Sequence, residues 1–175
     1  FESYGTNVIR TRAFNHEGPR RLNVFGLPWY AYQIARIKAG LQEPILKTGH
    51  TGDKRNFTHV SDMVEAYYLS VQKCDFGKLY LIGNNDPSYE YTFKECLDFL
   101  AKSADLSDYQ VTSDESFIRP TNVPFLIADC SEYVNKTGWA PKKSFQDIID
   151  DTMQYWIDNH GDHPNFKVIS DVKPV

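Results

Sequence analysis

The fold is decided by the stretch Asn7-Val8-Ile9-Arg10-Thr11-Arg12-Ala13-Phe14-Asn15-His16-Glu17-Gly18-Pro19-Arg20-Arg21. Its first seven residues alternate well enough in hydrophobicity to form a β-strand. The rest carries an amide, an imidazole, a carboxylate and two guanidinium groups around a Gly-Pro turn. Open α/β sheets place ligand contacts where their strands end, and arginine can grip phosphate oxygens in a bidentate manner. The stretch therefore predicts a strand that ends at a contact site for an anionic ligand.

Two amphipathic helices are predicted after this turn. The first has Pro28 near its start and ends at Gly40, with apolar residues at helical spacing at Tyr30, Ile34, Ile37 and Leu41. The second starts at Ser61 or Asp62 and carries one apolar stripe, which consists of Val64, Tyr67, Tyr68 and Val71.

Short apolar runs mark the strands between and after these helices. Residues 45–47 and 56–60 are extended candidates, and residues 109–112 form another. The run Leu79–Ile82 is apolar on both sides, which predicts an interior strand of a parallel sheet.

Three further helices are predicted in the second half of the chain. Thr92 and Glu95 form a capping box, residues 129–137 form a short helix that Gly138 stops, and Ser144 opens a last helix that extends toward Asn159. Strands and helices thus alternate at spacings too long for hairpins, which favours βαβ connections and an α/β fold.

Composition excludes several classes of protein. The 175-residue chain has a net charge of -4, whereas a general nucleic-acid binder needs a basic face. It contains no long uninterrupted apolar stretch and no signal-peptide pattern at its start, so we expect no membrane association. Its cysteines, Cys74, Cys96 and Cys130, have no Cys-x-x-Cys spacing, which argues against a disulfide framework or a zinc site and favours the cytoplasm.

The charged side chains leave two interpretations open when they are judged alone. Arg20 and Arg21 beside His16 are equally well interpreted as a phosphate clamp and as a solvated loop. Arg55 and Arg119, judged locally, are ordinary surface arginines.

No metal site or nucleophile is predicted. His160 and His163 lie three residues apart without a carboxylate or cysteine cluster that could complete a metal site. Cys130 has no identifiable base and is interpreted as a small buried residue. The chain also contains neither a Gly-x-Gly-x-x-Gly turn for a dinucleotide nor a Tyr-x-x-x-Lys pair, so we name no catalytic residue.

Several blocks of sequence resemble one family, the extended short-chain dehydrogenases that act on nucleotide sugars, and most closely the GDP-mannose 4,6-dehydratases. Residues 15–21 resemble that family's Asn-His-Glu-Ser-Pro-Arg-Arg, and residues 34–40 its Ala-Arg-Ile-Lys-x-Gly helix. Residues 54–57 resemble its Lys-Arg-Asp-Trp, residues 119–123 its Arg-Pro-x-x-Val, and residues 136–145 its closing helix signature. The spacing between the first three blocks also agrees without a gap.

The resemblance implies a fold and a division of the chain. The fold would be the C-terminal part of an extended Rossmann-type, NAD(P)-binding fold, with the last sheet strands and a mixed α/β lobe that binds the nucleotide sugar. Residues 1–159 would form this lobe and residues 160–175 a tail. The Gly-rich turn and the Tyr-x-x-x-Lys pair would belong to an N-terminal half upstream of Phe1, so the chain alone is not expected to be active.

The resemblance also implies ligands and their contacts. His16 and Arg21 would touch NADP (or NAD), if the N-terminal half is supplied. Asn15, Arg55 and Arg119 would contact the nucleotide sugar, for which a GDP-sugar is favoured. We further expect a homo-oligomer.

Two departures keep other functions open. Leu27-Pro28-Trp29 stands where the dehydratases have Thr-Arg-Lys, and Gly18 replaces their serine, as in related 4-keto-sugar reductases. A 4-keto-sugar reductase or epimerase therefore remains an alternative to a dehydratase. A non-catalytic fragment that binds a nucleotide sugar or associates with itself is another.

Overall fold

The computed structural model describes residues 1–118, 121 and 123–160. Arg119, His163 and all of the predicted tail except His160 lie outside the described residues. The chain divides into two compact units. The first comprises Phe1–Gly18, Lys54–Tyr91 and Phe125–Ile148, and the second comprises the other described residues. The boundary therefore falls within β7 (Glu90–Thr92) and α5 (Phe145–Asp158). Each unit is described on its own.

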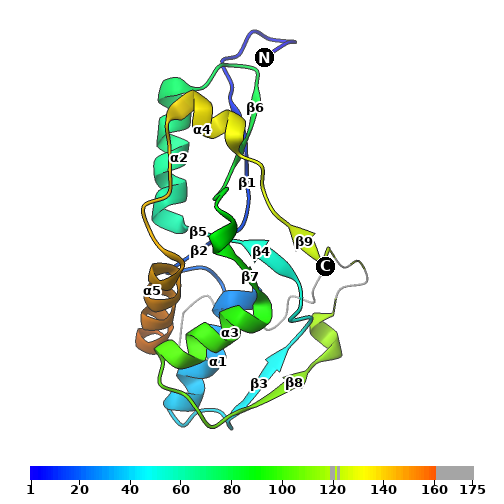
Figure 1. Cartoon of the computed structure of the whole chain (residues 1–175), viewed down its shortest axis with the longest axis vertical. Coiled ribbons are helices and arrows are strands. Elements are labelled where there is room, and N and C mark those ends of the chain that lie inside the picture. Colours follow the sequence, from blue (N-terminus) through cyan, green and yellow to red (C-terminus); the bar gives the residue numbers. More distant parts are fainter. Residues whose placement is uncertain (119–120, 122, 161–175) are drawn as a thin grey trace. The chain divides into compact units, whose positions relative to one another are not determined.

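Short parallel strand pairs build the first unit. β1 (Arg10–Ala13) pairs with β6 (Leu79–Ile82), β2 (His16–Glu17) with β5 (Thr58–His59), and β4 (Lys54–Asn56) with β9 (Phe125–Leu126), while β7 pairs with the other side of β4. Figure 1 shows α2 (Val60–Lys73) running alongside β1 and β6, with α4 (Ser131–Thr137) beside it. The unit also contains the short 3-10 helix η1 (Pro87–Tyr89). The predicted α/β connection through a helix is confirmed, because β1 and β6 pair in parallel and α2 lies between them in the chain.

Aromatic side chains fill the core of the first unit. Tyr80, Tyr133 and Trp139 are buried, and their rings meet edge to face at centroid distances of 6.2 Å (Tyr80–Tyr133) and 5.9 Å (Tyr133–Trp139). Met63 and Ala66 of α2 pack into the same cluster. The hydroxyl of Tyr133 donates a hydrogen bond to the backbone oxygen of Ala66 at 2.6 Å. Helices α2 and α4 are thus joined by both apolar packing and a buried hydrogen bond.

The apolar stripe predicted for α2 does not face this core. All four of its residues, Val64, Tyr67, Tyr68 and Val71, are exposed. The buried residues of α2 are instead Asp62, Met63, Ala66 and Ser70. Small residues on this inner face let α4 approach closely enough for the Tyr133–Ala66 hydrogen bond.

Asp62 explains why a charged residue lies on the inner face of α2. Its carboxylate is 3% exposed and accepts hydrogen bonds from the backbone N–H groups of Lys142 at 3.1 Å and Lys143 at 3.0 Å. The side chain of Lys142 reaches back to Glu65 at 2.6 Å. Asp62 therefore anchors the segment that leads from α4 to α5.

Strand β6 is less enclosed than its sequence predicts. Tyr80 and Ile82 are buried, but Leu79 is 47% exposed. Within the described residues β1 is its only strand partner, so β6 lies at an edge and the prediction of an interior strand is wrong in this respect. The predicted parallel pairing is confirmed.

The second unit packs two helices and a strand pair around an apolar core. Its elements are α1 (Gly26–Lys38), α3 (Phe93–Ser103), β3 (Ile45–Thr48), β8 (Gln110–Ser113) and the 3-10 helix η2 (Glu115–Phe117), together with the later part of α5. β3 and β8 are parallel. The predicted capping box opens α3, since Thr92 accepts from the backbone of Glu95 at 3.2 Å and donates its own N–H to the Glu95 carboxylate at 2.7 Å.

Helix α1 follows its predicted pattern only to its last turn. Tyr30 and Ile34 are buried, while Leu41 lies beyond the helix end and is 50% exposed. Gly40 adopts a left-handed conformation with φ of 70°, as its predicted role as a terminator requires. The start of α1 lies against α3, because a Cβ atom built on Gly26 would approach Phe93 Cε1 to 2.7 Å.

Candidate functional site

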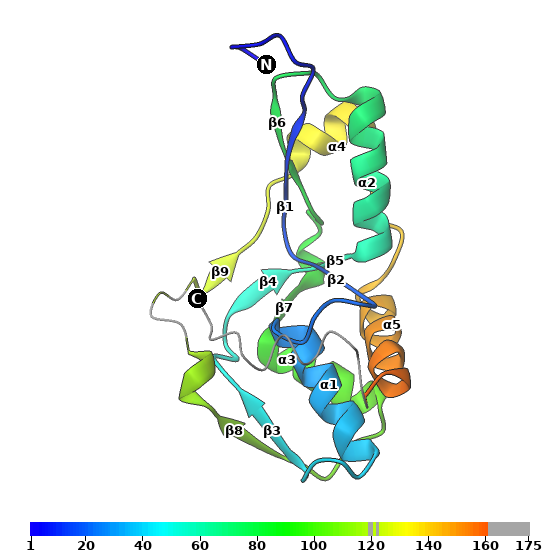
Figure 2. The ribbon, with the colours of Figure 1, turned by 180° about the vertical axis from the view of Figure 1, so that it is seen from behind.

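The candidate site lies where β1 ends in the first unit. The N–H of Phe14 donates to the oxygen of Ile82 at 2.8 Å, which continues the β1–β6 pairing by one residue. The backbone oxygen of Asn15 then accepts a hydrogen bond from the N–H of Thr58 at 3.1 Å. At this point the pairing partner changes, because β1 pairs with β6 and the following strand β2 pairs with β5. Figure 2 shows β2 and β5 side by side at this point. Asn15 thus stands at a strand end, where α/β sheets present ligand contacts.

His16 is held by its own backbone. It is half-buried in β2, and its Nδ1 lies 2.9 Å from the oxygen of Phe14. If Nδ1 carries the proton and donates to that oxygen, the other ring nitrogen is left as the acceptor. The imidazole is therefore oriented before any ligand arrives.

Arg55 occupies β4, three residues before Thr58. The side chain is half-buried, and its Nη1 donates to the oxygen of Lys54 at 2.8 Å. Lys54 itself pairs with Glu90 at 3.3 Å. Since Thr58 is bonded to Asn15, the strands bring the segment of Arg55 next to the turn that holds Asn15 and His16.

Sequence reasoning missed a buried polar cluster beside these residues. Asn56, Thr58 and Asn84 are at most 2% exposed, and the amide of Asn56 donates a hydrogen bond to the oxygen of Asn84. Among the described residues, Oδ1 of Asn56, Oγ1 of Thr58 and Nδ2 of Asn84 find no hydrogen-bond partner. Buried polar atoms are usually satisfied by protein or by ordered water. The available signal was the position of Asn84, which follows the end of β6 as Asn15 follows the end of β1.

Gly18 closes the turn in a way that a larger residue could not. Its φ is +152°, and a Cβ atom built on it would lie 2.7 Å from Cγ1 of Val60. The dehydratase-like serine at this position would therefore require Val60 to move.

Arg21, the fourth predicted site residue that the structure describes, lies in the second unit. Arg21 places its guanidinium carbon 4.0 Å from the ring centroid of Phe25, a cation–π contact. Asn15, His16 and Arg55 belong to the first unit and Arg21 to the second, so the structure groups three of the five predicted residues. Arg119 lies outside the described residues.

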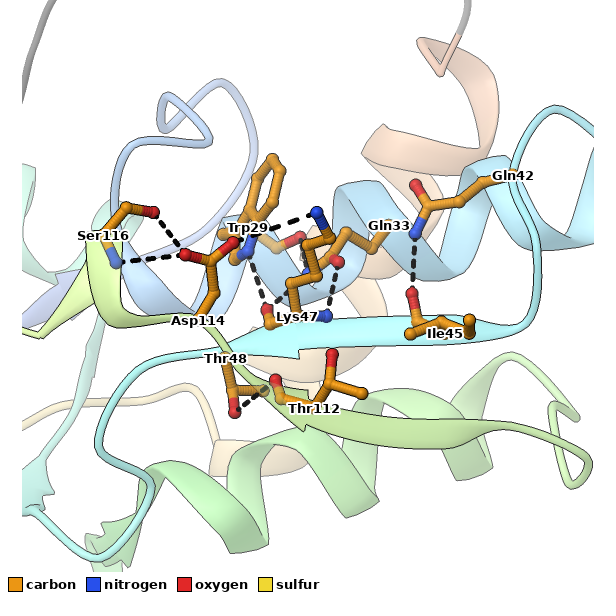
Figure 3. Close-up of polar contacts among 9 residues, drawn as sticks. All are labelled: Trp29, Gln33, Gln42, Ile45, Lys47, Thr48, Thr112, Asp114 and Ser116. Atoms are coloured by element: carbon orange, nitrogen blue, oxygen red, sulfur yellow. Dashed lines mark hydrogen bonds and ion pairs between the residues drawn. The ribbon is translucent and has the colours of Figure 1, made fainter.

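Trp29, which departs from the family pattern, is fixed by a polar network in the second unit (Figure 3). Its indole N–H donates to the oxygen of Lys47 at 2.9 Å. Gln33 bonds the same residue twice: its amide donates to the Lys47 oxygen at 3.0 Å and its oxygen accepts from the Lys47 N–H at 2.8 Å. The Trp29 ring also packs on Phe117 at a centroid distance of 5.4 Å. The indole of Trp29 is thus held in place by one hydrogen bond and one ring contact.

Thiol chemistry is not available at Cys130. Burial, reinforced by the neighbouring carboxylate of Asp129, raises the pKa of the Cys130 thiol to about 12. The thiol is 1% exposed and stays protonated at neutral pH. Cys130 is thus a buried structural residue, as its sequence context predicts.

The part of the chain that the structure describes contains neither a metal-binding cluster nor a membrane-spanning helix. No group of three or more His, Cys, Asp or Glu residues there could hold a metal ion. No helix there is both long enough and apolar enough to cross a membrane.

The residues present fit a nicotinamide dinucleotide only in part. The oriented imidazole of His16 and the cation of Arg21 suit contacts with ribose or phosphate oxygens. The Gly-rich turn that cradles a pyrophosphate is not among the residues of this sequence. Side chains of a suitable kind for such a cofactor are thus present, and a phosphate cradle is not among the residues of this sequence.

Comparison with known proteins gives a consistent result. The family model described as GDP-mannose 4,6 dehydratase matches residues 1–152. The GDP-mannose 4,6 dehydratase of Cricetulus griseus is 26% identical over 179 residues, covering 94% of this chain and 48% of the relative. The GDP-6-deoxy-D-mannose reductase of Pseudomonas aeruginosa is 28% identical over 151 residues, covering 84% and 48%.

A solved structure agrees with these relatives. RMD from Pseudomonas aeruginosa, complexed with NADPH, has a TM-score of 0.81 and 25% identity, over 90% of this chain and 51% of that one. The predicted α/β fold class, part of an extended Rossmann-type fold with its mixed α/β lobe, is thereby confirmed. The chain spans about half the length of the relatives that it matches.

Proposed function

The chain belongs to the GDP-mannose 4,6-dehydratase family, and from this premise we propose that it is the nucleotide-sugar-binding part of an NAD(P)-dependent nucleotide-sugar 4,6-dehydratase. One observation carries the proposal: the hydrogen bond from Thr58 to Asn15 joins the end of β1 to the segment of Arg55. An amide, an oriented imidazole and a guanidinium are thereby gathered at strand ends. This combination suits a phosphorylated, hydroxyl-rich ligand.

The proposed ligand contacts follow from charge and chemistry. A sugar diphosphate that leaves water needs fixed cations to offset its lost hydration, and Arg55 and Arg119 would supply them. Asn15 would hydrogen-bond the diphosphate through its amide. A GDP-sugar is the favoured substrate, since the curated relatives that match are named for GDP-sugars.

His16 and Arg21 would contact NADP or NAD. The sequence has no Tyr-x-x-x-Lys pair, so catalysis would require the part of the relatives that this chain does not match. In this proposal residues 1–159 form the binding lobe and residues 160–175 a tail.

The proposal includes a location and an assembly state. Cys74, Cys96 and Cys130 are all free thiols, which suits a reducing compartment such as the cytoplasm. Exposed apolar residues in the first unit favour self-association into a homo-oligomer.

Calorimetry with GDP-mannose, GDP and UDP tests the binding function. We expect heat on mixing with the guanine nucleotides, and a loss of about 10- to 100-fold in affinity in Arg55→Ala, because a hydrogen bond to a charged group contributes roughly 1.5–3 kcal/mol. Arg12→Ala, which removes an exposed arginine of the same unit, is the matched control. Absence of heat with all three nucleotides, or equal affinity of the two variants, would refute the proposal.

A turnover assay tests the division of labour. The chain alone, mixed with GDP-mannose and NADP, should form no product. Full turnover would show that catalysis does not need the unmatched part of the relatives.

A second candidate, a 4-keto-sugar reductase of the same family, is favoured by Gly18. A serine Cβ at that position would clash with Val60, and Asn-His-x-Gly-Pro is the reductase-like form of the motif. Tighter binding of a GDP-4-keto-6-deoxy sugar than of GDP-mannose would support the reductase. Nucleotide-sugar binding without a partner that restores turnover would instead indicate a non-catalytic binding fragment.

A further inference from the structure

The buried polar cluster of Asn56, Thr58 and Asn84 plays no part in the proposed nucleotide-sugar contacts. The three residues belong to the first unit and are 2%, 1% and 2% exposed. One side-chain atom of each, Oδ1 of Asn56, Oγ1 of Thr58 and Nδ2 of Asn84, has no hydrogen-bond partner among the described residues. A buried polar atom without a partner destabilises a fold, so these three atoms indicate a site for a small polar group.

Both amide groups of the cluster have only one possible orientation. The amide of Asn56 faces the backbone oxygen of Asn84, which can only accept, so its NH2 group points there and its Oδ1 points away. Oδ1 of Asn84 accepts from the backbone N–H of Asp86 at 2.9 Å, so Nδ2 of Asn84 points away from that bond. The cluster therefore presents one acceptor, one donor and the hydroxyl of Thr58, which can act as either.

Asn56 and Thr58 lie on the same face of their segment. The N–H of Phe57 donates to the backbone oxygen of Tyr89 at 3.3 Å, and the N–H of Thr58 donates to that of Asn15 at 3.1 Å. The two acceptors lie in different segments, η1 and the end of β1, as consecutive N–H groups of an extended chain require. Alternate side chains of an extended chain share a face.

Strand pairing brings Asn84 to this face. β1 and β6 end in register, because their last residues pair with each other, and Asn15 and Asn84 each follow two residues later. Thr58 is bonded to Asn15 through its backbone, and Asn56 is bonded to Asn84 through its side chain. The three side chains therefore meet where β1 and β6 end.

The donors and acceptors of the cluster select a neutral hydroxyl group. A metal ion or an ammonium group cannot accept a hydrogen bond from Nδ2 of Asn84, and a carboxylate cannot donate one to Oδ1 of Asn56. A hydroxyl group does both, and its oxygen has a further lone pair for Thr58. None of the three residues is charged, so the cluster itself does not offset the lost hydration of an ion.

We propose that Asn56, Thr58 and Asn84 bind one neutral hydroxyl group, which a buried water molecule supplies in the free chain. A buried water typically makes about three hydrogen bonds to polar atoms that lack other partners, and the cluster offers three such atoms. The bound group links the ends of β1 and β6 to the segment that carries Arg55. The site requires no nucleotide and does not depend on the proposed function.

Asn56 is a departure from the family pattern that this site explains. It stands where the dehydratases have the aspartate of Lys-Arg-Asp-Trp. An ionised aspartate has no proton to donate to the backbone oxygen of Asn84. The Asn56–Asn84 hydrogen bond, and with it the orientation of Oδ1, therefore depends on the asparagine.

Thr58→Val tests the site through the sign of its effect on the melting temperature. Valine keeps the shape of threonine and replaces the hydroxyl with a methyl group. If Oγ1 of Thr58 bonds to a bound hydroxyl, the variant loses a buried hydrogen bond and should melt about 2–4 °C lower than its control. If Oγ1 has no partner, removing it should leave the melting temperature unchanged or raise it.

The control is Thr112→Val, the same substitution at an exposed residue of strand β8. It includes the gain in strand preference that valine brings, so the difference between the two variants isolates the buried hydroxyl. A Thr58→Val variant that melts at or above the temperature of Thr112→Val would overturn the proposal.

Nuclear magnetic resonance observes the bound group directly. In the 15N-labelled chain without ligand, the side-chain NH2 of Asn84 should show an NOE to water whose sign is opposite to that of the matching ROE, which marks a long-lived contact rather than proton exchange. Because the cluster is buried, we expect this signal to persist when mannose or GDP-mannose is added. Its replacement by NOEs from carbon-bound sugar protons would assign the same site to a sugar hydroxyl. Absence of the water signal in the free chain would refute the site, whereas the calorimetry described above would be unaffected.

Discussion

Tyr133 on α4 and Ala66 on α2 are joined by a buried hydrogen bond of 2.6 Å from the tyrosine hydroxyl to the backbone oxygen. Both residues are fully buried. The bond fixes the depth at which α4 packs on α2, and it explains why α2 turns its small residues inward.

Tyr133→Phe removes this bond and keeps the ring. We expect a loss of about 1 kcal/mol in the free energy of unfolding, typical of one buried hydrogen bond. Urea unfolding measures it, with Tyr4→Phe at an exposed tyrosine as the control. Equal stability of the two variants would mean that the hydroxyl contributes nothing.

Gln33 and Gln42 offer a matched pair of substitutions in the second unit (Figure 3). Gln33→Leu removes both bonds to Lys47 and leaves a strand N–H without its acceptor, which should cost about 1–3 kcal/mol. Gln42→Leu removes one surface bond to Ile45 and should change stability by less than about 0.5 kcal/mol. Chemical denaturation of both variants checks the difference, and a similar loss in the two would contradict the role assigned to Gln33.

Asp75 predicts a pH dependence. The hydrogen bond from Lys136, and then that from Lys78, lowers the pKa of the Asp75 carboxyl below its ordinary value. The folded state thus binds this proton less readily than the unfolded state. The ionised Asp75 carboxylate therefore adds to the free energy of unfolding. This contribution is fully present above the ordinary carboxyl pKa of about 3.9, and it is lost as the pH falls through the lower pKa that Asp75 has in the folded state.

Melting temperatures of wild type and Asp75→Asn between pH 6 and pH 2 check this expectation. The wild type should melt higher at pH 6, and the difference should shrink as the pH falls. Asp108→Asn, an exposed carboxylate in the second unit, controls for the loss of one negative charge. If the difference in melting temperature between the wild type and Asp75→Asn stays constant down to pH 2, the carboxylate of Asp75 paired with Lys136 is not its source.

The three thiols should differ in reactivity. Cys96 and Cys130 are at most 1% exposed, and the raised pKa of Cys130, about 12, leaves almost no thiolate at pH 8. Cys74 is half-buried. Ellman's reagent should therefore label one thiol in the native chain and three in urea. In Cys74→Ser the native signal should vanish, and a rapid reaction that remained would place another thiol at the surface.

Local patterns in the sequence predicted the helix starts well. Thr92 and Glu95 cap α3 as expected, and Ser144 and Asp147 form the same reciprocal pair before α5, with bonds of 2.7 Å and 3.1 Å. Such signals act within a few residues, so the sequence alone contains them.

The orientation of α2 could not be predicted in the same way. Helical spacing identifies an apolar stripe, but it does not say whether the stripe or a face of small residues meets the rest of the fold. That choice depends on Tyr133 and on the backbone at Lys142, which come from a distant part of the chain.

The same reasoning applies to the candidate site. Asn15 and Arg55 were found because strand ends and a family resemblance point to them. Thr58 and Asn84 were not, because β2 and β5 are only two residues long and show no periodicity. Their proximity arises from pairing between distant segments.

The parallel pairings have a consequence for how the chain reaches its structure. Arg10 pairs with Leu79, Ile45 with Gln110 and Lys54 with Phe125, so each of these contacts closes a long loop. The chain loses that loop entropy before the contacts stabilise it, and such topologies fold more slowly than helical proteins of similar size. We expect the helices to form early and strand pairing to limit the folding rate, so the newly made chain passes through a period in which its strand edges are open to aggregation.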